Sequence, residues 1–475
     1  MKPKNKTNMK RYFITMLALF TLIFCSAGCG GCSKKNPKEV LEAAYNKTFI
    51  DNNPLETIVG FSDINETQNE KDAHSTGLSL TLQDLSGEGL DDLSAFSGLG
   101  FTMDSASDLA NRKSSGSISV NYGGSTYITL GGQIQGSKIF LTVPQLLDGS
   151  ISLDLSTMKE DLESDSLLAT ALRENGLDLS KEFSADMFES LGSLSALEDL
   201  GDLTSAMDDF TESILVKEAD KSVTAPDDVK AKSLYTVTIP ADAYNDFAKS
   251  FFKLVFDYMT EYTNAIAEAL DGTATVTDLD EINDSLDELA EAVGDIVLTV
   301  AVNGDGYITY VFTEVKNETE NFTLTAKLLG KENPLHNTEI VFDGNIDGET
   351  FSLTYEDSFD TDNNTIALNA EFEADDESVL KIGFEGALTD IEKGKKYTLD
   401  MDFLEIEVPD VLSVSLAGSY YIDTTKCDIT APTGTEYGLL TMTESDLTAL
   451  VMEVLTNLQA DPLLSELLNY IDLGF

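Results

Sequence analysis

The chain has 475 residues, of which 42% are hydrophobic, and this composition is enough to build a large core and argues against a disordered protein. Its 84 Asp and Glu residues far outnumber its 30 Lys and Arg residues, which gives a formal net charge of -54. A field of this sign repels nucleic-acid phosphates, so we expect no nucleic-acid partner.

Residues 1–28 predict a secretory signal peptide, because a basic start precedes an apolar stretch and then small residues. The apolar stretch, about 13 residues, makes a helix of about 20 Å, whereas a hydrocarbon core is about 30 Å thick. This length disfavours a permanent membrane anchor over residues 12–31, which is the alternative. Cleavage removes five positive charges and no acid, and takes the net charge from -54 to -59; the five are Lys2, Lys4, Lys6, Lys10 and Arg11.

Ser26-Ala27-Gly28-Cys29 resembles the lipobox of bacterial membrane lipoproteins. The resemblance implies that Cys29 accepts diacylglycerol and becomes the first mature residue, with residues 29–36 as a lipidated, flexible tether. Two acyl chains anchor a protein stably, so we expect attachment to the extracytoplasmic face of the cell membrane. Cys29 and Cys32 also form a CxxC pair, but no second pair completes a zinc site, and we expect no metal and no cofactor.

The segment 37–270 is expected to be a strand-rich region with helical insertions. Asn36 and Pro37 are typical of a helix start, as N-cap and first helical residue. From about residue 74 short β-prone runs predict an antiparallel meander, with turns at three pairs that contain glycine. The runs are 117–120, 125–130, 138–143 and 150–155, and the turns are Gly123-Gly124, Gly131-Gly132 and Asp148-Gly149.

Two acidic stretches rich in Ser, Gly and Leu, at about 83–111 and 186–213, interrupt this region. The second has a leucine at every third position from 191 to 203, which predicts short helical turns that cap an edge of the sheet. A membrane-surface helix is the alternative, but its polar side carries acids instead of Lys or Arg.

After Pro240 the pattern predicts a helix with two adjacent apolar faces. One face, which contains Phe247, is typical of a core helix under a sheet. The second face contains Phe252, Phe256 and Met259, and these three residues are our candidates for the lining of an apolar ligand cavity.

The segment 271–475 is expected to be an antiparallel meander with C-terminal helices. A helix begins near Thr277, and from residue 296 to about 422 apolar and polar residues alternate, as in strands with one wet face. Thr443 starts a further helix with a capping box, and Asp461-Pro462 starts another.

We therefore predict an α+β fold: a large curved antiparallel β-sheet, half-barrel-like, with helices packed on its apolar face. In the order of its elements the chain resembles the LolA-like and LppX-like half-barrel lipoproteins. That resemblance implies an acyl chain or other apolar ligand in the concave face of the sheet, and assigns no binding residue.

No motif points to catalysis. Residues 343–348 and 303–309 imitate parts of calcium loops, but Thr354 stands where the first needs a bidentate Glu, and both are read as turns between strands. The acidic run from Asp357 to Asn364 could hold a weak cation but is also typical of a solvated turn. His74 and His336 lack any catalytic signature.

The sequence thus predicts a non-enzymatic, lipid-anchored cell-surface protein whose membrane contact is its lipid. It either binds a lipid or other apolar ligand, or acts as a structural or protein-interaction module of the cell envelope.

Overall fold

The computed structural model describes residues 36–69, 73–87, 96–174, 200–269, 279–316, 320–346, 348–375, 377–409 and 411–460. It is 29% helical and 48% strand, an α+β protein built on an antiparallel sheet that is open and not a closed barrel. This confirms the predicted fold class; the predicted curvature stays a prediction.

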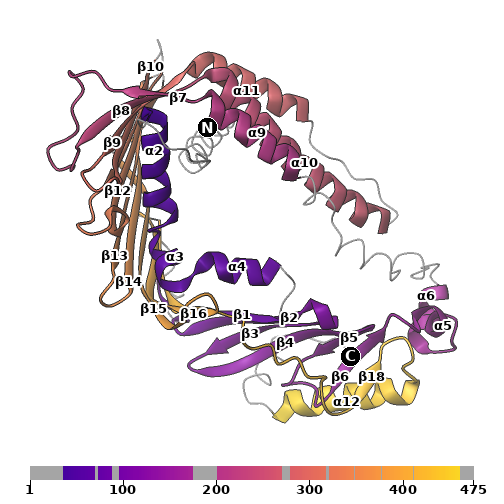
Figure 1. The fold of residues 1–475 in the computed structure, drawn as a ribbon. Coiled ribbons are helices and arrows are strands. Elements are labelled where there is room, and N and C mark those ends of the chain that lie inside the picture. Colours follow the sequence, from indigo (N-terminus) through magenta and orange to yellow (C-terminus); the bar gives the residue numbers. More distant parts are fainter. Residues whose placement is uncertain are drawn as a thin grey trace. The chain divides into compact units, whose positions relative to one another are not determined.

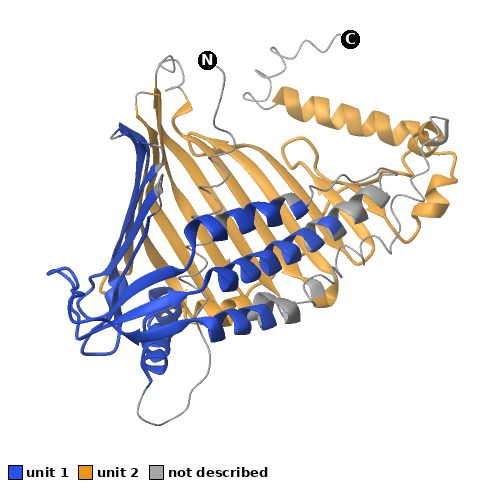
Figure 2. Ribbon diagram, turned by 90° about the horizontal axis from the view of Figure 1, so that it is seen from above, with its two compact units in different colours: residues 1–57, 190–360, 367–381 blue, residues 58–189, 361–366, 382–475 orange. Residues whose placement is uncertain are grey.

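The chain forms two compact units that are interleaved in sequence (Figure 2). Unit 1 comprises residues 1–57, 190–360 and 367–381, and unit 2 comprises residues 58–189, 361–366 and 382–475. Both units therefore take segments from either side of residue 270.

Unit 1 contains four helices and seven complete strands among the described residues. The helices are α2 (Pro37–Tyr45), α9 (Leu200–Ser213), α10 (Ala241–Ala269) and α11 (Leu279–Val293), and a π-helix, Asn46–Ile50, follows α2. The strands are β7 (Leu215–Glu218), β8 (Ser233–Ile239), β9 (Ile296–Val302), β10 (Ile308–Lys316), β11 (Glu320–Leu328), β12 (Asn337–Ile346) and β13 (Glu349–Asp360), and a short 3-10 helix, Pro334–His336, precedes β12. They pair in chain order, and each pair is antiparallel.

The core of unit 1 lies between these helices and one face of β8–β11. Phe210 of α9, Phe247 of α10 and Ala290 of α11 are buried there against strand residues such as Val237 and Val300. Burial of such large apolar side chains stabilises a fold by about 1.5–3 kcal/mol each. The predicted packing of helices on an apolar sheet face is thus confirmed for unit 1.

Helix α2 lies along these strands (Figure 1), and the π-helix that continues it is hydrogen-bonded to β10. Asn36 caps it as predicted, its side chain accepting a hydrogen bond from the amide of Lys38. At the other end the buried hydroxyl of Thr48 accepts a hydrogen bond of 2.9 Å from the amide of Ile308, the first residue of β10.

Unit 2 contains nine described strands beside β14 and β15. The strands are β1 (His74–Gly87), β2 (Leu99–Asp108), β3 (Lys113–Tyr122), β4 (Ser125–Gln135), β5 (Lys138–Thr142), β6 (Ser150–Asp154), β16 (Lys396–Val408), β17 (Leu412–Asp423) and, as a short edge, β18 (Glu436–Gly438). Its helices are α4 (Phe61–Asn69), α5 (Met158–Leu162), α6 (Leu167–Glu174) and α12 (Glu444–Ala460), and a 3-10 turn, Leu109–Asn111, joins β2 to β3. Three elements contain residues of both units: α3 (Pro54–Val59), β14 (Thr365–Ala374) and β15 (Glu377–Glu392).

The strands of unit 2 pair in the order β16, β17, β1, β2, β3, β4, β5, β6, β18. All pairs are antiparallel except β6 with β18, which is parallel. At the β18 edge, α12 packs through Leu450 on a small cluster that includes Tyr437 and Ile151. The capping box predicted at Thr443 is present, since Thr443 and Asp446 exchange side-chain-to-amide hydrogen bonds.

Three sequence predictions need correction. Gly131-Gly132 is not a turn but lies inside β4, which continues to a turn at Gly136. The stretch 83–111 contains the end of β1 and the whole of β2, whose polar residues hid its strand period. Residues 186–199, which hold most of the predicted leucine-rich turns, lie outside the described residues; the described remainder is one helix, α9, which packs on the core through Phe210 instead of forming short turns.

Candidate functional site

The sheet of unit 2 has two chemically opposite faces, which the register of its strands defines. Met103 lies opposite Ile118, and Ile118 lies opposite Leu130. Every second residue along each strand from these positions lies on the same face and continues the apolar row. On β16, β17 and β1–β6 this face has no Asp, Glu, Lys or Arg at any paired position. Its apolar members include Leu399, Met401, Leu404, Ile406, Val408, Leu412, Val414, Leu416, Leu78, Leu80, Leu82, Leu85, Phe101, Met103, Ile118, Val120, Ile128, Leu130, Ile134, Ile139, Leu141, Ile151 and Leu153. We call it the apolar sheet face.

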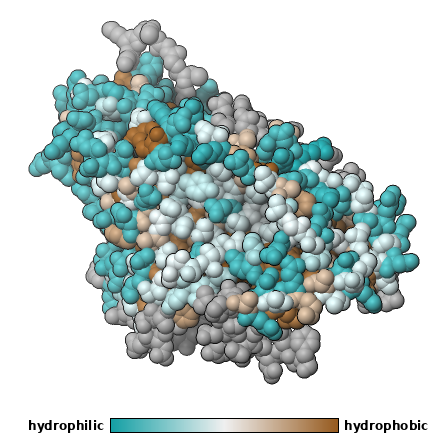
Figure 3. Space-filling view, turned by 90° about the horizontal axis from the view of Figure 1, so that it is seen from below, coloured by the Kyte–Doolittle hydropathy of each residue, from teal (hydrophilic) through white to brown (hydrophobic). Residues whose placement is uncertain are grey.

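The other side of the same strands is polar. Ser117, between Gly116 and Ile118 in sequence, belongs to this side together with Asp104 and Gly131. A shallow hollow of about 440 Å³ lies over these strands and is lined by serine, threonine, glycine and a few charged residues. Figure 3, which views the molecule from below, shows a surface that is white to teal over most of its described residues, with separate brown patches.

The centre of the apolar sheet face is open to solvent. Phe101, Met103, Ile118, Leu130 and Leu141 keep between 41 and 49% of their surface exposed. They lie on four neighbouring strands, β2 to β5, so the exposed atoms form one patch.

The size of this face distinguishes it from ordinary surface apolarity. Eight strands about 4.8 Å apart, each with about five same-face residues about 6.8 Å apart, project to about 34 by 27 Å, or about 900 Å². Serine, threonine and glycine take part of this area, and α5 and α12 cover its β6 end, so the exposed apolar part is the smaller patch on β2 to β5. Apolar patches on soluble monomers rarely exceed a few hundred Å², and larger ones mark binding surfaces. The apolar sheet face is therefore the first candidate site.

Two β-bulges keep the apolar residues on this face. In β1 the register shifts between Leu82 and Asp84, and in β16 between Met401 and Leu404. Each bulge changes the spacing of same-face residues from two to three, so that Leu85 and Leu404 join the face. The regular alternation predicted from residue 296 to about 422 is thus wrong at Phe403 of β16, because Phe403 is part of the bulge.

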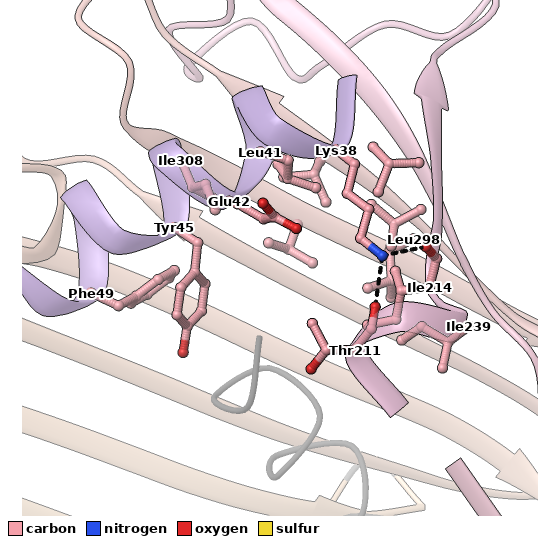
Figure 4. A pocket seen from close by; sticks show the side chains of 14 residues that line it. Lys38, Leu41, Glu42, Tyr45, Phe49, Thr211, Ile214, Ile239, Leu298 and Ile308 are labelled. Atoms are coloured by element: carbon pink, nitrogen blue, oxygen red, sulfur yellow. Dashed lines mark hydrogen bonds between the residues drawn. The ribbon is translucent and has the colours of Figure 1, made fainter. Parts of the chain in front are cut away.

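The second candidate site is a cavity of about 90 Å³ inside unit 1, under α2 (Figure 4). Its wall consists of side chains from α2, the end of α9 and the apolar side of β7–β10. The apolar lining residues are Leu41, Tyr45, Phe49, Ile214, Val216, Val237, Ile239, Leu298, Val300, Ile308 and Val311. Lys38, Glu42 and Thr211 complete the lining.

Lys38 closes one side of this cavity by binding the end of α9. Its ammonium group donates hydrogen bonds to the carbonyl oxygens of Thr211 at 2.7 Å, Glu212 at 3.2 Å and Ile214 at 3.2 Å. The last carbonyls of a helix lack partners in the helix and carry partial negative charge, so a cation is favourable there. All three ammonium hydrogens are used, and Lys38 therefore has none left for a ligand.

The residues predicted to line a ligand cavity do not line this one. Phe252 and Phe256 of α10 are half-buried, and the Phe252 ring meets that of Phe251 edge-to-face at 5.9 Å. The side chain of Met259 and the whole of Cys29 lie outside the described residues. Ligand lining by Phe252, Phe256 and Met259 and lipidation of Cys29 therefore stay predictions. The cavity was missed because its wall combines residues from helices and strands that no local sequence period connects.

The calcium-like motifs lie where consecutive strands are joined, and the first includes the last residues of β12. Residues 343–348 fall in the hairpin of β12 and β13, where Asp343 lies opposite Ser352. Asn303 binds the amides of Asp305 and Tyr307 within the β9–β10 turn. Among the described residues no three His, Cys, Asp or Glu side chains gather as a metal site.

Asp357 lies inside β13 and not in the acidic turn where the sequence placed it. Burial raises the pKa of its carboxyl group, while hydrogen bonds from Tyr355, at 2.8 Å, and from Thr338 oppose that rise. By register it shares a face with Thr338, Tyr355 and Ile340, at one end of a row whose middle is apolar.

The thiol of Cys427 and the imidazole of His336 both have pKa values shifted by burial. Burial raises the pKa of the Cys427 thiol, which lies 3.2 Å from the carbonyl oxygen of Ser107. Burial lowers the pKa of His336, whose ring packs at 5.6 Å from Phe359.

Within the described part of the chain, no helix has both the length and the apolarity needed to cross a membrane.

Comparisons with known proteins identify no family. No family model matches the chain, and no curated protein matches it. Among solved structures, a mutant of the vaccine antigen transferrin binding protein B from Haemophilus parasuis Hp5 aligns over 74% of this chain and 75% of its own, with 8% sequence identity and a TM-score of 0.10. A likeness this low establishes no shared fold, and the chain is assigned to no family.

Proposed function

We propose that this protein is a non-enzymatic, lipid-anchored surface protein that binds the acyl chains of a lipid on its apolar sheet face. One observation carries the proposal: a face of about 900 Å² without a single Asp, Glu, Lys or Arg, whose central side chains are nearly half exposed. Acyl chains are the occupant that such a surface can bind without unpaired polar groups.

A protein partner fits this face less well. Interfaces between proteins carry about one hydrogen bond per 100–200 Å², which means about five to nine over this area. The centre of the face, from Phe101 to Leu141, offers no side-chain donor or acceptor. Hydrocarbon needs none.

Two adjacent residues of β3 provide a matched test. Ile118 points to the apolar sheet face and Ser117 to the opposite side, so Ile118→Glu and Ser117→Glu add the same charge to the same strand on different faces. We expect Ile118→Glu to weaken uptake of a fluorescent fatty acid by tenfold or more, because bound acyl chains would bury a carboxylate. Ser117→Glu should leave uptake unchanged.

The mature protein, purified from membranes in mild detergent and transferred to native mass spectrometry, shows whether lipid is bound. Absence of bound lipid together with absence of fatty-acid uptake would reject the proposal and leave the structural or protein-interaction module. Equal loss of uptake in both variants would also reject this face as the site.

The anchor is tested separately. With labelled palmitate in the native host, the label should enter the wild type and not Cys29→Ala, which should be released or left unprocessed. Label in Cys29→Ala, or none in the wild type, contradicts lipidation at Cys29.

A further inference from the structure

We propose that the cavity under α2 is a second binding site, specific for a short alkylammonium group. It lies wholly inside unit 1 and does not depend on lipid binding by the apolar sheet face in unit 2. Three observations carry the proposal: the size and apolarity of the cavity, the carboxylate of Glu42 in its wall, and the engagement of Lys38 elsewhere.

The cavity has room for a short alkyl chain. At about 30 Å³ for each small group, the volume of about 90 Å³ holds about three carbons, with further atoms at the open mouth. Valine, leucine and isoleucine side chains form most of its wall, and apolar cavities of this kind stay dry and accept apolar guests.

Glu42 gives this apolar cavity a negative charge. Its half-buried carboxylate extends from α2 and lines the cavity (Figure 4). Lys38 stands one helical turn earlier but makes no salt bridge with Glu42; it binds the end of α9 with all three hydrogens. The partial negative charge of that helix end offsets the ammonium, so the carboxylate is left to attract a cation.

Two aromatic rings next to Glu42 suit the same guest. Tyr45 and Phe49 follow Glu42 along one side of α2 and the π-helix, both line the cavity, and their ring centroids are 5.1 Å apart. Aromatic faces attract ammonium groups, and they add apolar contact for the attached carbons. An anionic guest meets no free cation here, because the Lys38 hydrogens are already used.

Isothermal titration of the mature protein with n-butylamine, n-butanol and butyrate tests the site. We expect n-butylamine to bind at least about tenfold tighter than n-butanol, from a charge-assisted hydrogen bond to Glu42, and butyrate not to bind. Equal affinity for amine and alcohol, or no binding of any of the three, overturns the proposal.

Three variants locate the effect. Glu42→Gln should bring n-butylamine to within about threefold of n-butanol while n-butanol still binds, which shows that the cavity is intact. Glu39→Gln removes the same charge from the same helix outside the cavity and should keep the preference. Val216→Phe, on the edge strand β7, should fill the cavity and remove binding of both n-butylamine and n-butanol. If Glu42→Gln still prefers n-butylamine to n-butanol by tenfold, Glu42 is not the group that binds the ammonium.

Discussion

The contact between Lys38 and the end of α9 predicts a measurable loss of stability when its charge is removed. Lys38→Met keeps the aliphatic stem that covers the cavity but leaves the carbonyls of Thr211, Glu212 and Ile214 without their donor. A cation at a helix C-terminus contributes about 0.3–2 kcal/mol, and hydrogen bonds to charged groups about 1.5–3 kcal/mol. Because Lys38 is only half-buried, solvent screening brings the expected loss to about 1–3 kcal/mol.

Urea unfolding and calorimetry of the mature protein measure this loss. For a cooperative unit of 150–250 residues, each kcal/mol lowers Tm by about 2–4 °C. The control is Lys253→Met on α10, which removes an equal charge from an exposed pair with Asp257 at 2.7 Å. Exposed pairs at this spacing contribute about 0.3–0.5 kcal/mol, so the control should barely move Tm. Equal destabilisation by the two variants would show that total charge, and not the bond to α9, explains the effect.

Three more predictions follow from the described contacts. Since burial raises the pKa of Asp357, the fold prefers the protonated carboxyl group and gains stability as the pH falls through that raised pKa. Asp357→Asn should therefore raise the urea midpoint of unit 1 at pH 7 and leave it unchanged at pH 3. An unchanged midpoint at pH 7 contradicts this prediction. Gly418→Ala should cost about 1–3 kcal/mol because its Cβ meets the backbone of Ser79, whereas Gly132→Ala, with open space around it, should be neutral within about 0.5 kcal/mol; comparable unfolding free energies would refute this. The Cys427 thiol, whose pKa is raised by burial, should alkylate more slowly at pH 8 in the folded protein than in urea, and equal rates of iodoacetamide labelling at this peptide would contradict its burial.

Elements with a strong period were predictable from sequence, and elements that depend on distant partners were not. The caps at Asn36 and Thr443 and the alternation from residue 296 to 422 identified their helices and strands, because the signals are local. Strand β2 was missed because Ser105 and Ser107 continue its apolar side, which therefore has only a few large apolar residues such as Phe101 and Met103. Gly131-Gly132 was misread as a turn because Gly131 serves close packing against Thr142, which is eleven residues away in sequence.

The candidate sites show the same limit. Alternation alone indicated a sheet with one apolar face, and this holds for unit 2. That the centre of this face stays exposed could not be deduced, because exposure depends on which other elements cover it. The cavity under α2 depends on α2, α9 and β7–β10 meeting in space, so Glu42 and Lys38 carried no sequence signal that distinguished them from other charged residues on helices.

The two bulges stand on either side of β17, and this position has a consequence for how the chain can change. The bulge in β1 lies opposite Leu416 and Ser415, and the bulge in β16 lies opposite Leu416 and Gly418. An extra residue in a strand normally turns every later side chain to the opposite side, but here each neighbour of β17 absorbs one locally. Deletion of Gln83 or of one residue at Phe403 should therefore remove the bulge and leave the leucines beyond it on the apolar sheet face.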